Sequence, residues 1–282
     1  MKAFEVSQVL KEYPGFRMSI PEFSMDEGYI MGLVGENGAG KTTLIKLLMG
    51  MVHPAEGTTA VLGTDSSSEK FVALKEDIGV VIGDAGFPDY MDADRVGDIM
   101  EVGYQSWDMD YYHELLDRLG ADRTNKYKNM STGNKAKIAI AAAFAHHPRV
   151  LLLDEPTSGL DPNVRGEILS MLNEFTRDEH HSVLISSHIT SDLERCCDYI
   201  TFLHHGEIML SEEKDRLMEE YGVLRLADEE AAQVEPEAVV ARRNGKYGSE
   251  LLVDRQRLGS EQECGAIGLE DLFIFLTEGS RK

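Results

Sequence analysis

The sequence predicts an α/β protein whose core is a largely parallel β-sheet with helices on both faces. Three observations support this fold class. Five short apolar runs lack the alternation of half-buried strands, segments of helical periodicity separate them, and the first run leads into a glycine-rich loop. The expected buried strands are residues 29–34, 78–82, 150–153, 182–187 and 199–203.

Composition limits the classes of protein to which the chain can belong. Its 282 residues include 50 Asp and Glu but only 28 Lys and Arg, a formal net charge of −22. A surface this acidic repels phosphate backbones, so nucleic acid and anionic lipid are poor main partners. No apolar run approaches the ~18–20 residues that cross a bilayer. The three cysteines form no CxxC motif, which indicates reduced thiols in a cytosolic protein.

The first predicted strand opens a strand–loop–helix unit. It ends at Gly35, a glycine-rich loop follows, and residues 42–49 form a predicted helix with three leucines on one side. Between the second and third strands, residues 92–119 show helical periodicity and no strand signal. The simplest interpretation is an insertion of helices into the α/β core.

The composition changes near residue 210, and a small appended α+β domain is predicted over residues 216–282. Its strongest local signal is Asn244-Gly245, a hairpin turn pair between two short strands. The expected elements are a charged helix over 212–222, two strands within 239–253 and an amphipathic helix over 269–276.

Residues 35–42, GENGAGKT, fit the pattern GxxxxGK[ST], which arises by chance in roughly one chain per hundred of this length. The glycines let successive backbone N–H groups point at phosphate oxygens, and the following helix adds its positive end. Lys41 supplies a charge for the β and γ phosphates, and the Thr42 hydroxyl is suited to Mg²⁺. The segment therefore predicts a triphosphate-binding loop.

Two acids end the strand at residues 150–153, at the edge of the sheet where ligands of open α/β folds bind. Asp154 is suited to the Mg²⁺ shell, and Glu155 to polarising an attacking water molecule. His188 directly follows the strand at residues 182–187, which favours a functional over a structural histidine.

These motifs, in this order and spacing, resemble the ATP-binding subunit of an ABC transporter, a P-loop NTPase of ABC type. The resemblance covers residues 1 to about 210. The further matching segments are Met130-Ser131-Thr132-Gly133-Asn134 as the signature loop (LSGGQ in the family), Ser158-Gly159-Leu160-Asp161 as the D-loop, Ser186-Ser187-His188 as the switch histidine, and Tyr13 as the adenine-stacking aromatic residue.

The resemblance implies an ATPase domain over residues 1–215, with an antiparallel β portion and a helical subdomain at about 85–147. It also implies a role for each matching residue. ATP would be bound by Tyr13, Gly35, Asn37, Gly38, Gly40, Lys41, Thr42 and Thr43, with Ser131, Gly133 and Asp161 reaching across a dimer interface; Glu155 and His188 would be catalytic; Thr42, Asp154 and Asp84 would hold Mg²⁺.

The chain departs from the family pattern at two places. The signature loop has Thr132 and Asn134 where the family usually has Gly and Gln, and we expect this to be tolerated. The family glutamine after the second strand, which touches Mg²⁺ and links to the membrane subunit, is absent, because no Gln lies between Gln8 and Gln105. Asp84 is the better candidate for an oxygen ligand there, and the usual coupling contact is in doubt.

Two groups of aromatic side chains allow alternative interpretations. Phe87, Tyr90 and Trp107 either belong to the core of the helical subdomain or anchor a short helix from a membrane-embedded partner. Phe87 and Tyr90 lie on an expected loop and should be the most exposed. The adjacent histidine pairs at 146–147, 180–181 and 204–205 do not converge on one metal and are expected to be solvated or capping.

The favoured function is ATP hydrolysis that drives transport, with the chain as a cytosolic dimer on the inner face of the membrane, bound to a separate permease. Residues 269–273 resemble the tail of subunits that serve export systems of the drug and antimicrobial-peptide kind. The second ATPase subunit is either an identical or a different chain, and residues 216–282 would stabilise the dimer or regulate it. The alternatives are a soluble ABC-type ATPase and an ATP-gated binding subunit with little hydrolysis.

Overall fold

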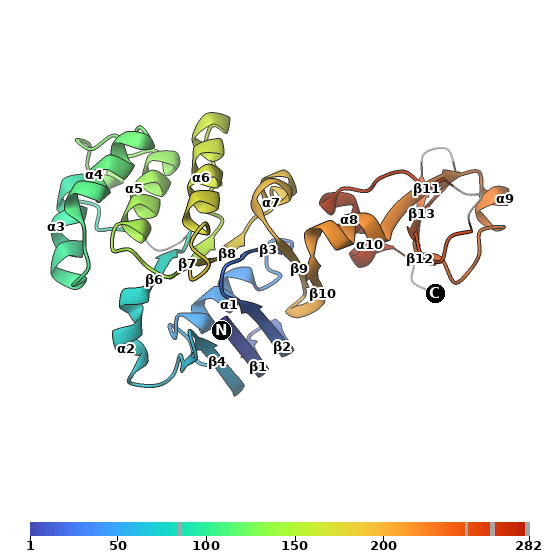
Figure 1. Ribbon diagram of the computed structural model, residues 1–282, viewed down its shortest axis with the longest axis horizontal. Coiled ribbons are helices and arrows are strands. Elements are labelled where there is room, and N and C mark those ends of the chain that lie inside the picture. The colour runs from blue at the N-terminus through green and yellow to red at the C-terminus, as the bar shows by residue number, and fades with distance from the viewer. Residues whose placement is uncertain (84–85, 246–247, 260–262, 280–282) are drawn as a thin grey trace.

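The computed structural model describes residues 1–83, 86–245, 248–259 and 263–279. The molecule is elongated (Figure 1). Helices α3 (Ala93–Gly103) and α4 (Met109–Arg118) lie at one end, the C-terminal elements lie at the other, and a six-stranded sheet lies between them. No described helix combines the length and the apolar composition needed to cross a bilayer.

The central sheet confirms the mostly parallel core. Its strand order is β10-β9-β3-β8-β7-β6, and each neighbouring pair is parallel except β9 and β10. Strands β3, β7 and β8 are buried at every position, which explains why their sequences are continuously apolar. The strands are β3 (Ile30–Val34), β6 (Ile78–Val81), β7 (Val150–Asp154), β8 (Ser182–Ser186), β9 (Tyr199–His204) and β10 (Glu207–Glu213).

The antiparallel β portion is a second sheet of order β2-β1-β4-β5. Its strands were not located from the sequence, and β1 shows why. Val6 and Val9 are both buried although three positions separate them, because Gln8 has a φ of 52° and shifts the register with β4. Such a bulge interrupts the alternation that identifies a half-buried strand. The strands are β1 (Lys2–Tyr13), β2 (Phe16–Asp26), β4 (Glu56–Val61) and β5 (Thr64–Asp65).

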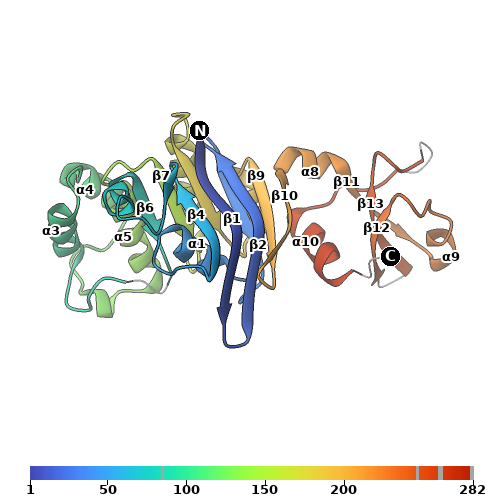
Figure 2. The same cartoon turned by 90° about the horizontal axis from the view of Figure 1, so that it is seen from below.

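Helices cover both faces of the central sheet, as Figure 2 shows from below. Helix α1 (Lys41–Leu48) is packed between the two sheets, and Leu44 and Leu47 have no exposed surface there. The opposite face is covered by α5 (Thr132–Phe144), α6 (Pro162–Phe175) and α7 (Thr190–Cys196). The short connecting elements are α2 (Phe71–Leu74), η1 (Lys75–Asp77) and η2 (Tyr127–Asn129).

The helices α3 and α4 confirm the predicted insertion between β6 and β7. Its aromatic residues mainly form its own core: Tyr112 is fully buried and donates to the Ala93 carbonyl at 3.0 Å, and Trp107 packs against Tyr112. Tyr90 is 63% exposed, as expected for the loop. Phe87 is only half-exposed, because its ring packs edge-on against Tyr127.

One guanidinium group joins the inserted helices to the core. Arg118 at the end of α4 donates through Nε to Glu167 at 2.5 Å and through Nη1 and Nη2 to both oxygens of Glu174 at 2.9 Å. Both glutamates lie on α6, seven residues apart. The two carboxylates raise the pKa of Arg118, so this guanidinium is charged at every accessible pH.

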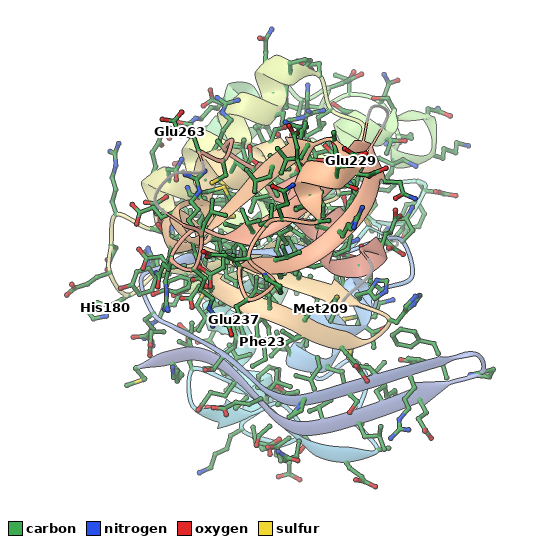
Figure 3. All side chains as sticks on the ribbon, turned by 90° about the vertical axis from the view of Figure 1, so that its right-hand side faces the viewer. Phe23, His180, Met209, Glu229, Glu237 and Glu263 are labelled. Atoms are coloured by element: carbon green, nitrogen blue, oxygen red, sulfur yellow. The ribbon has the colours of Figure 1, made fainter. Side chains whose placement is uncertain are left out.

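The C-terminal elements form a three-stranded antiparallel sheet of order β11-β13-β12 with helices against it, and Figure 3 views this end of the molecule, with Glu229 and Glu263 among the labelled side chains. One face of this sheet packs against α10 and is continuous with the main hydrophobic core. Helix α9 contacts strands β13 and β11 of the sheet. The elements are α8 (Lys214–Glu220), β11 (Tyr221–Leu226), α9 (Asp228–Ala231), β12 (Val239–Gly245), β13 (Gly248–Asp254) and α10 (Leu269–Glu278).

The predicted charged helix over 212–222 is confirmed but shorter, as α8, because β10 continues to Glu213 and β11 begins at Tyr221. The two predicted strands are confirmed as β12 and β13, but the predicted turn between them is misplaced. Asn244 and Gly245 do not form a turn: they pair with Ser249 and Gly248 in the β12–β13 ladder. The residues between these strands, 246–247, lie outside the described part of the chain.

The histidine pairs also differ from expectation, because His146 is buried. Its two ring nitrogens lie 3.3 Å and 3.2 Å from the carbonyl oxygens of Ala142 and Ile78, and its ring stacks on Tyr104. Burial lowers the pKa of His146 below the usual value of a histidine. His181 fits the capping alternative: its Nδ1 lies 3.1 Å from the carbonyl oxygen of Phe175, the last residue of α6, and its ring stacks on that of Phe175.

Candidate functional site

The glycine-rich loop connects β3 to α1 and brings the sequence-predicted residues together. Gly38 and Gly40 have φ values of 86° and 112°, which glycine adopts without strain. A Cβ atom at Gly40 would also lie 2.6 Å from Met18 Cε and 2.9 Å from the Phe16 ring. The backbone therefore turns tightly enough for α1 to begin at Lys41, with its N-terminus directed at the loop.

Lys41 is held inside this loop and is only 6% exposed. Its Nζ donates to the carbonyl oxygens of Gly35 at 2.6 Å and Glu36 at 3.3 Å, and it lies 3.3 Å from Glu155 Oε1. A buried ammonium needs such acceptors, because desolvation without partners is costly. They fix the charge of Lys41 at the mouth of the loop, where phosphate oxygens would approach.

Thr42 and Asp154 bring two oxygen groups together at the end of β7. The Thr42 hydroxyl donates to Asp154 Oδ2 at 2.5 Å, and the other carboxylate oxygen accepts from the Ser186 hydroxyl at 2.6 Å. A hydroxyl and one carboxylate are the ligands that Mg²⁺ accepts when phosphates and water complete its shell. The donor set therefore fits Mg²⁺. The sequence did not predict this contact of Ser186, although Ser186 belongs to the segment Ser186-Ser187-His188 that resembles the family pattern.

Glu155 lies between Lys41 and His188. Its Oε2 is 2.5 Å from His188 Nδ1 and accepts from the His188 backbone N–H at 3.3 Å. The Glu155 backbone has a φ of 50°, and its N–H is held by the Ser186 hydroxyl at 3.0 Å. This left-handed conformation is unfavourable for a glutamate and turns its side chain away from that of Asp154.

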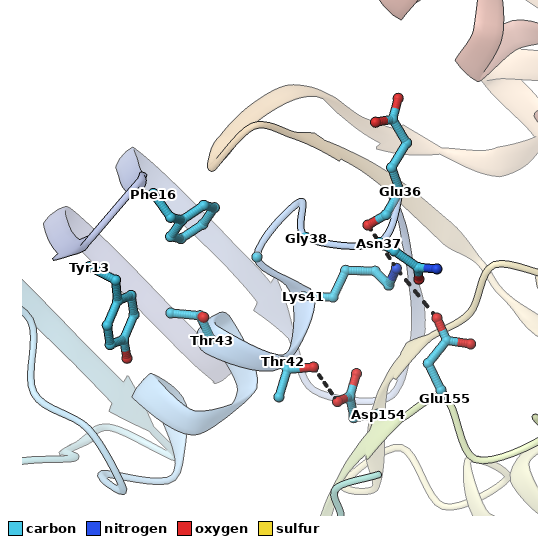
Figure 4. Close-up of a pocket in the computed structure, with 11 residues that line it drawn as sticks. Tyr13, Phe16, Glu36, Asn37, Gly38, Lys41, Thr42, Thr43, Asp154 and Glu155 are labelled. Atoms are coloured by element: carbon cyan, nitrogen blue, oxygen red, sulfur yellow. Dashed lines mark hydrogen bonds and ion pairs between the residues drawn. The ribbon is translucent and has the colours of Figure 1, made fainter. Parts of the chain in front are cut away.

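A cavity of about 380 Å³ runs along this loop (Figure 4). Tyr13 and Phe16, from the tip of the β1–β2 hairpin, line one side, and Asp154 and Glu155 line the other. Tyr13 is 41% exposed, Lys11 Nζ lies 5.2 Å from its ring centroid, and the ring lies beside that of Phe16. Phe16 was missed in the sequence, although a second aromatic residue three positions after Tyr13 was a usable signal. The remaining lining residues are Glu36, Asn37, Gly38, Gly40, Lys41, Thr42 and Thr43.

The signature-like segment does not line this cavity. Ser131 is exposed and caps α5, accepting from the Asn134 backbone N–H at 3.1 Å. Asp161 is also exposed and caps α6, accepting from Asn163 and Val164. A Cβ at Gly133 would lie 3.5 Å from the carbonyl oxygen of the D-loop's Gly159. Ser131, Gly133 and Asp161 thus share one surface, apart from the loop of their own chain.

Asn134 explains how the unusual signature residue fits. Its carboxamide accepts from the Asp122 N–H at 2.6 Å and donates to the Asp122 carbonyl at 2.9 Å. Asp122 is itself held by Thr124, whose backbone N–H and hydroxyl help to lower the pKa of Asp122 to about 2. The two-point contact ties the start of α5 to a rigid loop.

A second network, which the sequence did not reveal, lies behind the D-loop. Asp192 on α7 is 3% exposed and accepts from the Thr157 hydroxyl at 3.0 Å. Arg165 Nε lies 3.7 Å from the same carboxylate, and its Nη2 donates to the Leu160 carbonyl at 3.4 Å. The segment after His188 and the D-loop are therefore joined by one buried carboxylate.

The predicted ligand Asp84 lies outside the described residues. Beside the end of β6, a cavity of about 220 Å³ opens between the central sheet and the inserted helices. Its wall is mostly apolar and includes Phe87, Met100, Tyr104 and Met51, which is 53% exposed. Such a groove suits the apolar face of a short helix.

Comparisons with known proteins agree with this geometry. A family model described as "ABC transporter" matches residues 19–158. The chain is 32% identical over 226 residues to the ABC transporter ATP-binding protein YtrB of Bacillus subtilis, an alignment that covers 80% of this chain and 74% of YtrB. It is also 32% identical over 185 residues to the bacitracin transport ATP-binding protein BcrA of Enterococcus faecalis, covering 65% of this chain and 60% of BcrA.

Solved structures show the same fold. One described as an ATP-binding subunit of an ABC transporter superposes with a TM-score of 0.68 at 24% identity, covering 77% of this chain and 92% of that structure. A dimeric ATP-binding cassette, MJ0796, bound to ADP and Pi superposes with a TM-score of 0.65 at 20% identity, covering 74% of this chain and 98% of that structure. At these identities the likeness concerns the fold alone.

Proposed function

Because the chain belongs to the ABC transporter family, as an ATP-binding subunit whose ATPase activity powers transport, we propose that the loop at residues 35–42 and the end of β7 form its hydrolytic site. The observation that carries the proposal is the convergence of Lys41, Thr42, Asp154 and Glu155 on one cavity. These groups come from two elements that are more than a hundred residues apart in sequence.

Each group has a task that follows from its position. Lys41 and the loop N–H groups bind the β and γ phosphates of ATP, and Tyr13 covers the adenine. Thr42 and Asp154 would hold Mg²⁺, which would neutralise charge on the phosphates. Glu155 orients and deprotonates the attacking water. His188, which contacts Glu155, holds that carboxylate in place and lies where the γ-phosphate would end.

The remaining ATP contacts come from a second subunit. Ser131 and Gly133 would donate to the γ-phosphate of the neighbouring chain, aided by the N-terminus of the 13-residue helix α5. Asp161 would reach across the same interface. We propose the ATPase domain at residues 1–215 as the dimerising unit, and residues 216–282 as an accessory domain.

The groove beside Phe87 is proposed to receive a short helix of a separate membrane permease, which would keep the chain at the inner face of the membrane. Tyr90, exposed at the loop before α3, would be its second anchor. The double variant Phe87→Ala/Tyr90→Ala should keep basal ATPase activity but lose co-purification with the permease. Unchanged co-purification would remove this docking site.

Export is the proposed direction of transport. It is supported by the resemblance of residues 269–273 to the tail of export-type subunits and by the similarity to BcrA, a bacitracin transport protein. A methionine import protein, MetN 1 of Acinetobacter baylyi, is 29% identical over 201 residues, so the cassette itself serves both directions. Deletion of the gene should raise the amount of substrate retained in cells, whereas reduced uptake would show import.

The ATPase proposal is tested by Glu155→Gln. Phosphate release should fall at least about 100-fold, because the general base is lost, while Mg-ATP binding measured by calorimetry stays within about threefold. Glu69→Gln, at an exposed glutamate in the loop before α2, is the matched control and should not change either quantity. Slow wild-type turnover that the Glu155→Gln change leaves unaltered would instead indicate ATP-gated binding with little hydrolysis.

A further inference from the structure

The C-terminal helix α10 approaches the ATP site through the last residue of β9. The ring of Phe273 on α10 lies edge-on to the ring of His204, with centroids 6.5 Å apart and an interplanar angle of 75°. Phe273 also packs against Phe202, two residues earlier on β9, at 5.5 Å. One side of His204 is therefore covered by an element that lies outside the proposed ATPase domain at residues 1–215.

The other side of His204 faces the phosphate-binding loop. Its Nδ1 lies 3.5 Å from Oε1 of Glu36, the second residue of that loop. This nitrogen is buried and makes no hydrogen bond among the described residues, although the His204 side chain as a whole is 23% exposed. A buried polar nitrogen directed at one carboxylate indicates that the two groups act on each other.

The turn that carries His204 cannot easily move away. His205 and Gly206 both have left-handed backbones, with φ values of 47° and 81°. The Gly206 N–H donates to the Ala39 carbonyl of the phosphate-binding loop at 2.9 Å, and its own carbonyl accepts from Ser19 on β2 at 2.9 Å. The turn is thus fixed to the loop and to the antiparallel sheet at once.

The position of Glu36 has an electrostatic consequence. A carboxylate in a loop that binds triphosphate repels its ligand, and the net charge of −22 adds to that repulsion. Glu36 lines the cavity, and Figure 4 shows its carboxylate directed away from the Lys41 ammonium. His204 Nδ1 is the polar group that the structure places 3.5 Å from the Glu36 carboxylate on that side.

We propose that His204 is a positioning residue that holds Glu36 away from the bound phosphates, and that Phe273 holds His204 in place. The C-terminal helix thereby sets the affinity of the loop for ATP. The proposal rests on the ATP site assigned above. It adds a regulatory role for residues 269–278, to which no role in ATP binding was assigned from the sequence.

The experiment measures KM for Mg-ATP and kcat in the full chain. His204→Ala should raise KM about three- to fivefold, the effect expected from loss of one partly exposed polar contact, with kcat within about twofold. Phe273→Ala should raise KM in the same direction by a smaller factor. The double variant should be no worse than His204→Ala, because Phe273 acts through His204.

Three further variants separate this role from general destabilisation. His204→Gln retains a side-chain N–H donor and should restore most of the affinity. In a Glu36→Gln background, His204→Ala should leave KM unchanged, because no carboxylate remains to be held. Ile274→Ala removes a partly exposed apolar side chain from the same helix without touching His204 and should leave KM unaltered. If Phe273→Ala unfolds the domain, Phe273→Leu keeps most of the apolar volume and removes the ring.

The outcomes are distinguishable from failure of the ATPase assignment. If wild-type protein does not bind Mg-ATP, the ATP site itself is wrong. If wild-type protein binds Mg-ATP and His204→Ala does not change KM, the positioning role is wrong. Additive effects of His204→Ala and Phe273→Ala would overturn the link to α10.

Discussion

The two halves of the proposed ATP site are built in opposite ways. Around the phosphate-binding loop, Lys41, Asp154 and Glu155 contact one another or shared neighbours, and the first two are buried. The surface shared by Ser131, Gly133 and Asp161 is called the signature surface. Ser131 and Asp161 are exposed there, and their side chains only cap the helices that follow them. The first half can bind phosphate within one chain, whereas the second offers its groups to another molecule. The difference is the one that the proposed two-subunit site requires: one half complete within the chain and the other exposed for a partner.

The largest change in ATPase activity is expected from mixing two inactive variants. Lys41→Ala removes the loop charge and Ser131→Ala the signature hydroxyl, so each variant alone should lose at least about 90% of its ATPase activity. An equimolar mixture should recover about a quarter of wild-type activity, because about half of the dimers are mixed and each mixed dimer has one intact site of two.

Phosphate release by the separate and mixed variants tests this comparison. Ser131→Ala also removes a helix cap, so Asp108→Ala, which removes the equivalent cap of α4, is the control for stability. A mixture no more active than its components would contradict a site shared between two copies of this chain.

A medium effect is expected at Asn134. Asn134→Ala breaks both bonds to Asp122 and frees the start of α5, so kcat should fall about tenfold, while ATP binding to the chain's own loop is unchanged. Asn134→Asp keeps the acceptor and loses the donor. Its rate of steady-state phosphate release should lie between those of the wild type and Asn134→Ala. Equal kcat for Asn134→Ala and the wild type would show that the signature surface needs no such support.

The sequence predicted the phosphate half of the site better than the rest, for a physical reason. Lys41, Thr42 and Asp154 are marked by local patterns, a glycine-rich loop and the end of an apolar strand. Asp192, by contrast, acts through contacts with Thr157 and Arg165, which lie 35 and 27 residues away in the chain and follow only from the tertiary fold. No local pattern could have identified it.

The secondary structure shows the same contrast between elements that the sequence predicted and elements that it did not. The buried strands of the central sheet were predictable because burial on both faces leaves a continuous apolar run. Strand β1 was not, because the bulge at Gln8 disturbs its alternation. In the C-terminal part, Asn244-Gly245 has the composition of a tight turn, yet the pairing of β12 with β13 extends through it. There, cross-strand packing outweighs local turn preference.

The smallest predicted effect concerns stability and His146, beside the groove. Since burial lowers the pKa of His146 in the folded state, the unfolded chain binds the proton more readily. The free energy of unfolding should therefore fall as the pH drops below about 6.5, the ordinary histidine value. Tm measured between pH 7.5 and 5.5 should decrease in the wild type and less steeply in His146→Leu. Identical slopes would show that other groups dominate this range.

The contact of Arg118 with α6 bears on how the signature surface can move. Glu167 and Glu174 lie two helical turns apart on α6, and the guanidinium of Arg118 is held by both. Because three donors of one guanidinium are engaged at the same time, a shift of α4 along α6 would break at least one of these bonds. The contact therefore couples the position of the inserted helices to that of α6.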